Sequence, residues 1–158
     1  MIKIITNIKS IMKFQTLFVL SLSVLSAFGF AAEHEVKMLN SGTEGFMVFE
    51  PAILKVEVGD TVIFKATDMA HNSASIAGMI PEGADSWNGA MSQDVIVTVN
   101  KEGIYVYQCT PHSMMAMVGV IQVGDSSANM AAIQAKVGNL KAGFVTNKER
   151  LDNYLGAL

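Results

Sequence analysis

Cys109-Thr110-Pro111-His112-Ser113-Met114-Met115-Ala116-Met117 is the stretch that decides both the fold and the chemistry of this chain. It contains the single cysteine, with a histidine three positions later and a methionine eight positions later. Apolar, strand-like sequence flanks it at 104–107 and 118–123. Thiolate, imidazole and thioether are ligands of a blue-copper electron-transfer site, in which two histidines and a cysteine form a trigonal plane and a methionine binds axially. The stretch supplies three of these four ligands, and the second histidine must be His34 or His71.

The N-terminal residues have the features of a secretory signal peptide. Lysines at 3, 9 and 13 precede an apolar run at 14–30, and Gly29 and Ala31 are small residues at the positions that a signal peptidase reads. We expect residues 1–31 to be removed after Ala31, and Met12 is an alternative start. The other interpretation is a membrane anchor, but the run barely reaches the ~20 apolar residues that span a bilayer. We therefore expect an exported protein with no membrane anchor after cleavage.

The chain from Ala32 onward is long enough for one domain with its own core. Without the signal lysines it carries eight Lys and Arg against fourteen Asp and Glu. This acidic balance argues against nucleic acid and anionic membranes as partners. A lone cysteine in an exported protein indicates an intermolecular disulfide, a reactive thiol or a metal ligand. The neighbouring His112 and Met117 favour the metal.

The segment 32–124 has the pattern of a mainly β domain. Alternation places Val36 and Met38 on one face of a strand, and Gly-rich turns separate one apolar run from the next. Many short strands of this kind predict a β-sandwich or barrel. Residues 68–83 show little periodicity and are expected to form a long functional loop that carries His71. The expected strands are 35–40, 46–49, 53–58, 61–66, 94–100, 104–109 and 118–123, with Pro51 at an edge or bend.

The segment 125–158 has helical periodicity instead. A first helix is predicted at 127–137, with Ser126 or Ser127 as N-cap and Gly138-Asn139 as its end. A capping box at 146–149 predicts a second helix, whose apolar stripe runs through Leu151, Tyr154, Leu155 and Leu158. We expect both helices to pack on the β domain as a structural extension. The sequence has no catalytic triad, carboxylate pair or Gly-rich phosphate loop, so we expect no enzyme.

Several segments resemble those of the pseudoazurins, a family of bacterial periplasmic cupredoxins. They are Met38-Leu39-Asn40, Met47-Val48-Phe49-Glu50-Pro51, Val58-Gly59-Asp60-Thr61-Val62, His71-Asn72, Gly78-Met79-Ile80-Pro81-Glu82-Gly83-Ala84, Cys109-Thr110-Pro111-His112 and 117–124. The resemblance covers essentially the whole chain after residue 31. It implies a cupredoxin-like Greek-key β-sandwich with two C-terminal helices and one type 1 copper. It also implies that the copper ligands are His71, Cys109, His112 and Met117, which leaves His34 as a solvated residue.

Four residues are expected to surround these ligands: Met47, Asn72, Pro111 and Met115. The Asn72 N–H is placed to donate to the Cys109 sulfur, while its side chain can tie the two ligand loops together. Pro111 has no N–H, so it cannot add a second donor, and the electron-rich thiolate then favours Cu(II) and a lower potential. The resemblance suggests that Met47 packs against a ligand imidazole. Met115, like Met114, is also a typical gap-filling residue.

The resemblance implies a periplasmic, monomeric one-electron carrier. Its expected partners are redox proteins, by resemblance a donor such as a c-type cytochrome and an acceptor such as copper nitrite reductase. We expect a small transient contact around His112, within an apolar patch of Met47, Pro111, Met114 and Met115. The alternative is a copper-delivery protein whose methionine-rich loop favours Cu(I). A third possibility, Cys109 as a catalytic nucleophile, lacks an orienting third group.

The chain departs from the family in two places. Pseudoazurins commonly surround the copper-proximal face with lysines, but here the comparable positions hold Ser41, Thr43, Met69, Asn88 and Gln108. Ser113-Met114-Met115 replaces the more usual aromatic-glycine sequence. The first departure leaves the choice of partner open, and the second makes the outer face of the ligand loop rich in methionine.

Overall fold

The computed structural model describes residues 31–158, so the predicted signal peptide, apart from Ala31, lies outside the described residues. Two four-stranded sheets precede two helices in this part of the chain, which confirms the predicted mainly β class. None of the helices in the described range is both long and apolar enough to cross a membrane.

The two sheets have mixed strand directions. The first has the order β2-β1-β4-β6 and the second the order β3-β8-β7-β5, with parallel pairing of β1 to β4 and of β3 to β8. Pro51 lies between β2 and β3, which are edge strands of different sheets, as its missing N–H favours. The strands are β1 (Glu33–Gly42), β2 (Gly45–Glu50), β3 (Ile53–Val56), β4 (Thr61–Lys65), β5 (Ala74–Ser75), β6 (Val95–Thr98), β7 (Gly103–Gln108) and β8 (Val118–Val123).

The main core lies between the two sheets. Val36 and Met38 of β1 face inward and are fully buried, as their alternation predicts. They join aromatic side chains of which Phe49 and Tyr107 meet edge to face, with ring centroids 4.8 Å apart. Cys109 and Met117 belong to the same cluster. The predicted metal loop is therefore built onto the sandwich core and is not an appendage of it.

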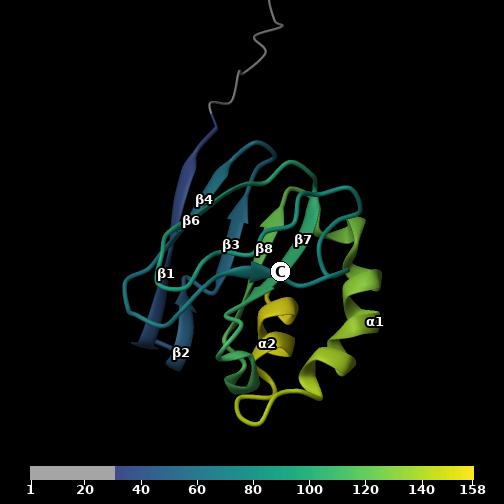
Figure 1. Ribbon diagram of the computed structural model, residues 1–158. Coiled ribbons are helices and arrows are strands. Elements are labelled where there is room, and N and C mark those ends of the chain that lie inside the picture. Colours follow the sequence, from purple (N-terminus) through teal and green to yellow (C-terminus); the bar gives the residue numbers. More distant parts are fainter. Residues whose placement is uncertain (1–30) are drawn as a thin grey trace, which may run out of the picture. The chain divides into compact units, whose positions relative to one another are not determined.

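A second core lies between β7 and β8 and the two helices (Figure 1). Ile104 and Val120 point to the helix side, where Ile133 of α1 (Met130–Lys141) and Leu151 of α2 (Arg150–Gly156) cover them. Because both faces of these strands are buried, their sequences are apolar apart from Gln108 and Gln122, and they do not alternate. The helices thus share a core with the sheet.

The helix boundaries differ from the prediction. Ser126 and Ser127 belong to a 3₁₀ turn, η2 (Ser126–Ala128), in which the Asp125 side chain accepts the Ser127 N–H at 2.8 Å. α1 begins later, at Met130, and continues through Gly138 to Lys141. A glycine inside a helix costs only about 1 kcal/mol, and packing of the half-buried Leu140 against the second core offsets it.

The predicted capping box is also wrong. α2 begins at Arg150, and no side chain caps its first turn. The Glu149 carboxylate accepts from the Lys141 ammonium at 3.3 Å instead of reaching back to Thr146. A contact with the neighbouring helix has replaced the local one.

Candidate metal centre

Three of the four predicted ligands converge at one end of the sandwich. The Cys109 Sγ lies 3.6 Å from the His71 Nδ1 and 3.3 Å from the His112 Nδ1, and the two nitrogens are 3.1 Å apart. This is the one such group of His, Cys, Asp and Glu side chains found in residues 31–158. His34 is not part of it, which leaves His71 as the second histidine of the cluster.

Backbone hydrogen bonds hold the ligand loop closed on itself. The Cys109 N–H donates to the Met117 carbonyl at 2.9 Å, and the Met117 N–H donates to the His112 carbonyl at 3.2 Å. Cys109 directly follows β7 and Met117 directly precedes β8, so the pairing of these strands sets the two residues side by side. A 3₁₀ turn, η1 (Ser113–Met115), takes up the residues between them.

The second histidine comes from a different part of the chain. His71 lies between β4 and β5, and its carbonyl accepts the Ser92 N–H at 2.7 Å. His71, Cys109 and Met117 are each 0% exposed, whereas His112 is half-buried. The site is closed to solvent except on the side of His112.

Asn40 fixes the orientation of His71, a role that the residue spacing did not indicate. The His71 Nε2–H donates to the Asn40 Oδ1 at 3.0 Å, and the Asn40 N–H in turn donates to Asp68 Oδ2 at 2.7 Å. This acceptor places the ring proton on Nε2 and leaves the Nδ1 lone pair directed at the cluster. Asn40 lies within the resembling segment 38–40, but that segment by itself assigned it no role.

Asn72 ties the two ligand loops together, as predicted. Its Oδ1 accepts the Thr110 N–H at 2.8 Å, and its Nδ2 donates to the Gly89 carbonyl at 3.1 Å and to the Thr110 hydroxyl at 3.2 Å. One buried amide therefore joins three segments around the cysteine.

The environment of the cluster favours an uncharged imidazole and a protonated thiol. Burial, followed by the neighbouring His112, lowers the pKa of His71, with Asp68 acting weakly in the opposite direction. Burial raises the pKa of Cys109, and the backbone N–H groups of Asn72 and His112 oppose that rise. Although Pro111 has no N–H, the next residue, His112, thus supplies a second backbone donor near the sulfur.

The other residues that were expected to surround the ligands differ in how far they are buried. Met47 is half-buried and packs against the core cluster that contains Cys109 and Met117. Pro111 and Met114 are exposed, Met114 by 54%, and Met115 is half-buried. The prediction of a solvated His34 is wrong, because its Nε2 lies 2.9 Å from the Asp60 Oδ2 in a half-buried pair.

The donor set fits a borderline first-row metal. A point equidistant from the two nitrogens and the sulfur lies about 1.9 Å from each, close to the ~2.0–2.3 Å bonds that imidazole and thiolate make to such ions. Two imidazole nitrogens and one cysteine sulfur close together, with a buried thioether on the cysteine's loop, are the ligand types of a type 1 copper site. Metal binding displaces the thiol proton.

Comparison with known proteins gives one consistent result. Residues 36–124 match the family of copper binding proteins described as the plastocyanin/azurin family. A pseudoazurin from Paracoccus pantotrophus is 43% identical over 132 residues, which cover 84% of this chain and 88% of that protein. The crystal structure of a native pseudoazurin from Hyphomicrobium denitrificans superposes with a TM-score of 0.71 at 38% identity, over 80% of this chain and 98% of that one. The pseudoazurin of Methylobacterium extorquens AM1 gives a TM-score of 0.70 at 39% identity, over 79% and 98%.

Proposed function

The chain belongs to the pseudoazurins, the cupredoxin electron carriers within the plastocyanin/azurin family of copper-binding proteins, and we propose that it carries single electrons between periplasmic redox proteins. Type 1 copper is the cofactor of this family. We assign the copper ligands to the His71 Nδ1, the Cys109 thiolate, the His112 Nδ1 and the Met117 thioether. When bound, this copper cycles between Cu(II) and Cu(I) and supplies the one-electron chemistry.

The observation that carries the proposal is the closed, preorganised triangle of His71, Cys109 and His112. Asn40 holds one imidazole, Asn72 holds the loop beside the thiolate, and backbone bonds hold the remainder. Ligands fixed in this way need little rearrangement when the charge at the site changes. Full burial of three ligands also disfavours the alternative of copper as cargo, because a delivery site must release its metal readily.

His112 provides the route by which an electron enters and leaves. It is the half-buried ligand, and the exposed Pro111 and Met114 lie beside it in the loop. A small apolar surface of this kind supports weak, fast-exchanging redox encounters. The protein needs no catalytic group of its own for this task, and we propose a monomeric carrier and not an enzyme.

Copper loading of the purified protein tests the assignment. One equivalent of Cu(II) should give an intense blue colour, because the charge-transfer band needs a thiolate ligand. Cys109→Ser should abolish the band, while the matched control His34→Ala should retain it. A blue Cys109→Ser variant would refute the ligand set. Release of the protein from intact cells by osmotic shock tests the proposed periplasmic location.

The partner surface is the feature in which this protein departs from its family. Met69 and Asn88 are exposed, and no lysine occupies either position. We propose partners that recognise an apolar or mildly acidic surface. The electron-transfer rate to an acidic acceptor should therefore stay constant or rise as salt is added, because the surface offers no attraction for salt to screen. Fast transfer to such an acceptor that slows steeply with added salt would contradict this proposal.

A further inference from the structure

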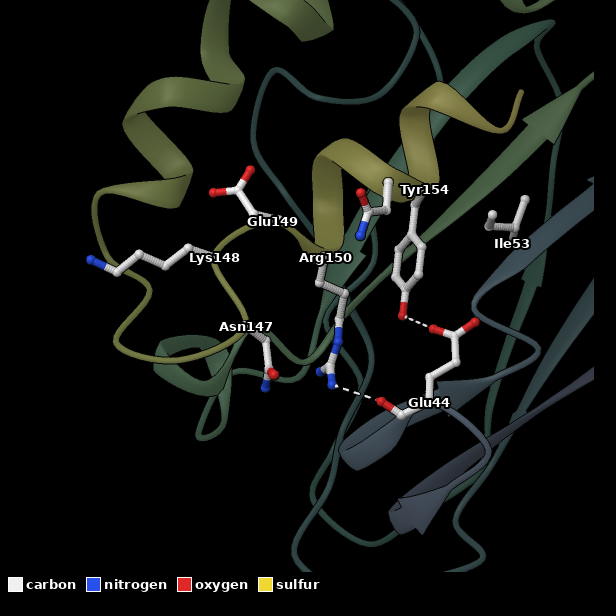
Figure 2. Close-up of a pocket in the computed structure, with 8 residues that line it drawn as sticks. Glu44, Ile53, Asn147, Lys148, Glu149, Arg150 and Tyr154 are labelled. Carbon is white, nitrogen blue, oxygen red and sulfur yellow. Dashed lines mark hydrogen bonds between the residues drawn. The ribbon is translucent and has the colours of Figure 1, made fainter.

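Arg150 is a buried charged residue to which the copper-binding role assigns no function. It is the first residue of α2 and is 8% exposed. Figure 2 shows its side chain, with that of Tyr154, reaching from α2 toward Glu44. The guanidinium donates to four backbone carbonyls, those of Met47 at 2.9 Å, Ala116 at 3.0 Å, Phe46 at 3.3 Å and Glu44 at 3.4 Å.

The charge of this guanidinium has no carboxylate partner. Within residues 31–158, every ion pair closer than 4.0 Å involves other residues. The nearby Glu44 carboxylate accepts from the Tyr154 hydroxyl instead (Figure 2). Burying a cation is costly unless several hydrogen bonds compensate, so the carbonyls of two distant segments must both be in place around Arg150.

The carbonyls at the two shortest distances belong to residues in an unfavourable backbone conformation. Ala116 has φ 55° and Met47 has φ 50°, and neither is a glycine. The left-handed region costs an L-residue roughly 1–2 kcal/mol, and it persists where the surroundings over-determine it. Arg150 contributes to those surroundings at both positions.

Ala116 is the residue immediately before the proposed axial ligand, Met117. Its carbonyl accepts from Arg150 on one side and from the Val118 N–H, at 2.9 Å, on the other. The carbonyls of the two preceding residues are bound by the same C-terminal segment as Ala116. Met114 accepts the Val145 N–H at 2.7 Å, and Met115 accepts the Asn147 Nδ2 at 3.2 Å. Three consecutive carbonyls of the ligand loop are thus bound by the segment 145–150.

We propose that Arg150 is a positioning residue for the copper centre. It holds Ala116 in the left-handed conformation, so that Met117 is presented to the metal in a fixed place. Its buried positive charge beside the loop also favours Cu(I), the less positive oxidation state. The proposal rests on the assignment of Met117 as a ligand, and it gives the segment 145–150 a role in the site, beyond that of a structural extension.

The test separates the charge from the geometry. Arg150→Lys keeps the positive charge but cannot bridge the segment 44–47 and Ala116. Arg150→Met keeps much of the bulk but loses both the charge and the bridging hydrogen bonds. We expect both variants to shift the intensity ratio of the visible copper bands, and Arg150→Met to have the lower reduction potential of the two. Tyr154→Phe is the matched control, because it removes the other α2 contact to Glu44 and leaves Ala116 untouched. It should keep the wild-type spectrum and potential.

Hydrogen exchange of the metal-free protein provides a readout that does not depend on copper. The Met117 and Val118 amides should exchange about tenfold faster in Arg150→Lys, the effect of losing one hydrogen bond to a charged group. Ala116→Gly should restore part of the wild-type band ratio in the Arg150→Lys background, since glycine adopts φ 55° without penalty. The proposal is overturned if Arg150→Lys and Arg150→Met match wild type in spectrum, potential and exchange. A wild-type protein that is not blue would refute the proposed function, while the exchange experiment would still test the positioning.

Discussion

Replacing Asn40 by alanine should weaken copper binding without disturbing the fold. The substitution removes the acceptor 3.0 Å from the His71 Nε2 and retains the backbone N–H that donates to Asp68. A neutral hydrogen bond contributes about 0.5–1.5 kcal/mol net, and loss of the group that orients a metal-binding histidine typically costs 10–100-fold in affinity. Because Asn40 is exposed, water can replace its amide in part. We therefore expect about a tenfold loss of affinity, at the lower end of that range.

Competition of the protein with a chromophoric Cu(I) chelator measures this loss directly. Asn100→Ala is the matched control, because Asn100 is also exposed and its side chain bonds to Asp85 and to no ligand. The reduction potential of Asn40→Ala should rise, since an imidazole without this acceptor is less basic and stabilises Cu(II) less. An affinity within twofold of wild type, together with an unchanged potential, would refute the claim that Asn40 orients His71.

Three further predictions concern other parts of the molecule. His71→Ala should abolish the blue spectrum and His34→Ala should leave it unchanged, and the reverse result would eliminate the proposed ligand set. Pro111→Ala restores a backbone N–H that can point at the thiolate sulfur, so voltammetry should show a higher potential; a blue variant with an unchanged or lower potential would make Pro111 only a turn residue. Asp60→Asn should destabilise the metal-free protein by about 1–2 kcal/mol at pH 7. A hydrogen bond from the Ala32 N–H, followed by bonds from other donors, lowers the pKa of Asp60. The contribution of this carboxylate to stability is therefore complete above the unfolded pKa of ~4 and is lost as the pH falls through the folded pKa. A stability difference between wild type and variant that persists at pH 2 in denaturant titrations would contradict this prediction.

The strands and the ligand cluster were predictable because they depend on local pattern. Val36 and Met38 alternate with polar residues because only one face of β1 is buried. β8 is apolar apart from Gln122 because both of its faces are buried. Cys109 and His112 are close in sequence, so one turn is enough to bring them together. His71 was assigned from the resemblance, and the fold places its Nδ1 3.6 Å from the Cys109 sulfur.

The features that the sequence did not predict depend on distant contacts. β5 lies within the segment 68–83, which was expected to be a loop, and it pairs with β7. It is only two residues long, so its sequence shows no periodicity that could predict a strand. The end of α1 is decided by packing on the sheet and not by Gly138. Arg150 reads as a surface residue in a helix, and its burial follows from carbonyls that lie 34 and 103 positions away.

The hydrogen bonds that hold the ligand loop are nearly all made to its backbone. The positions of the ligands therefore depend little on which side chains occupy residues 113–115. Carbonyls of Met114, Met115 and Ala116 accept from the segment 145–150 whatever side chains they carry. The change to Ser113-Met114-Met115 can therefore leave the ligands in place. Its effect falls on the exposed surface beside His112, where Met114 is 54% exposed. Met69 and Asn88, where the resemblance implies lysines in the family, are also exposed and uncharged. We therefore expect both departures to affect the recognition of the redox partner and not the binding of the metal.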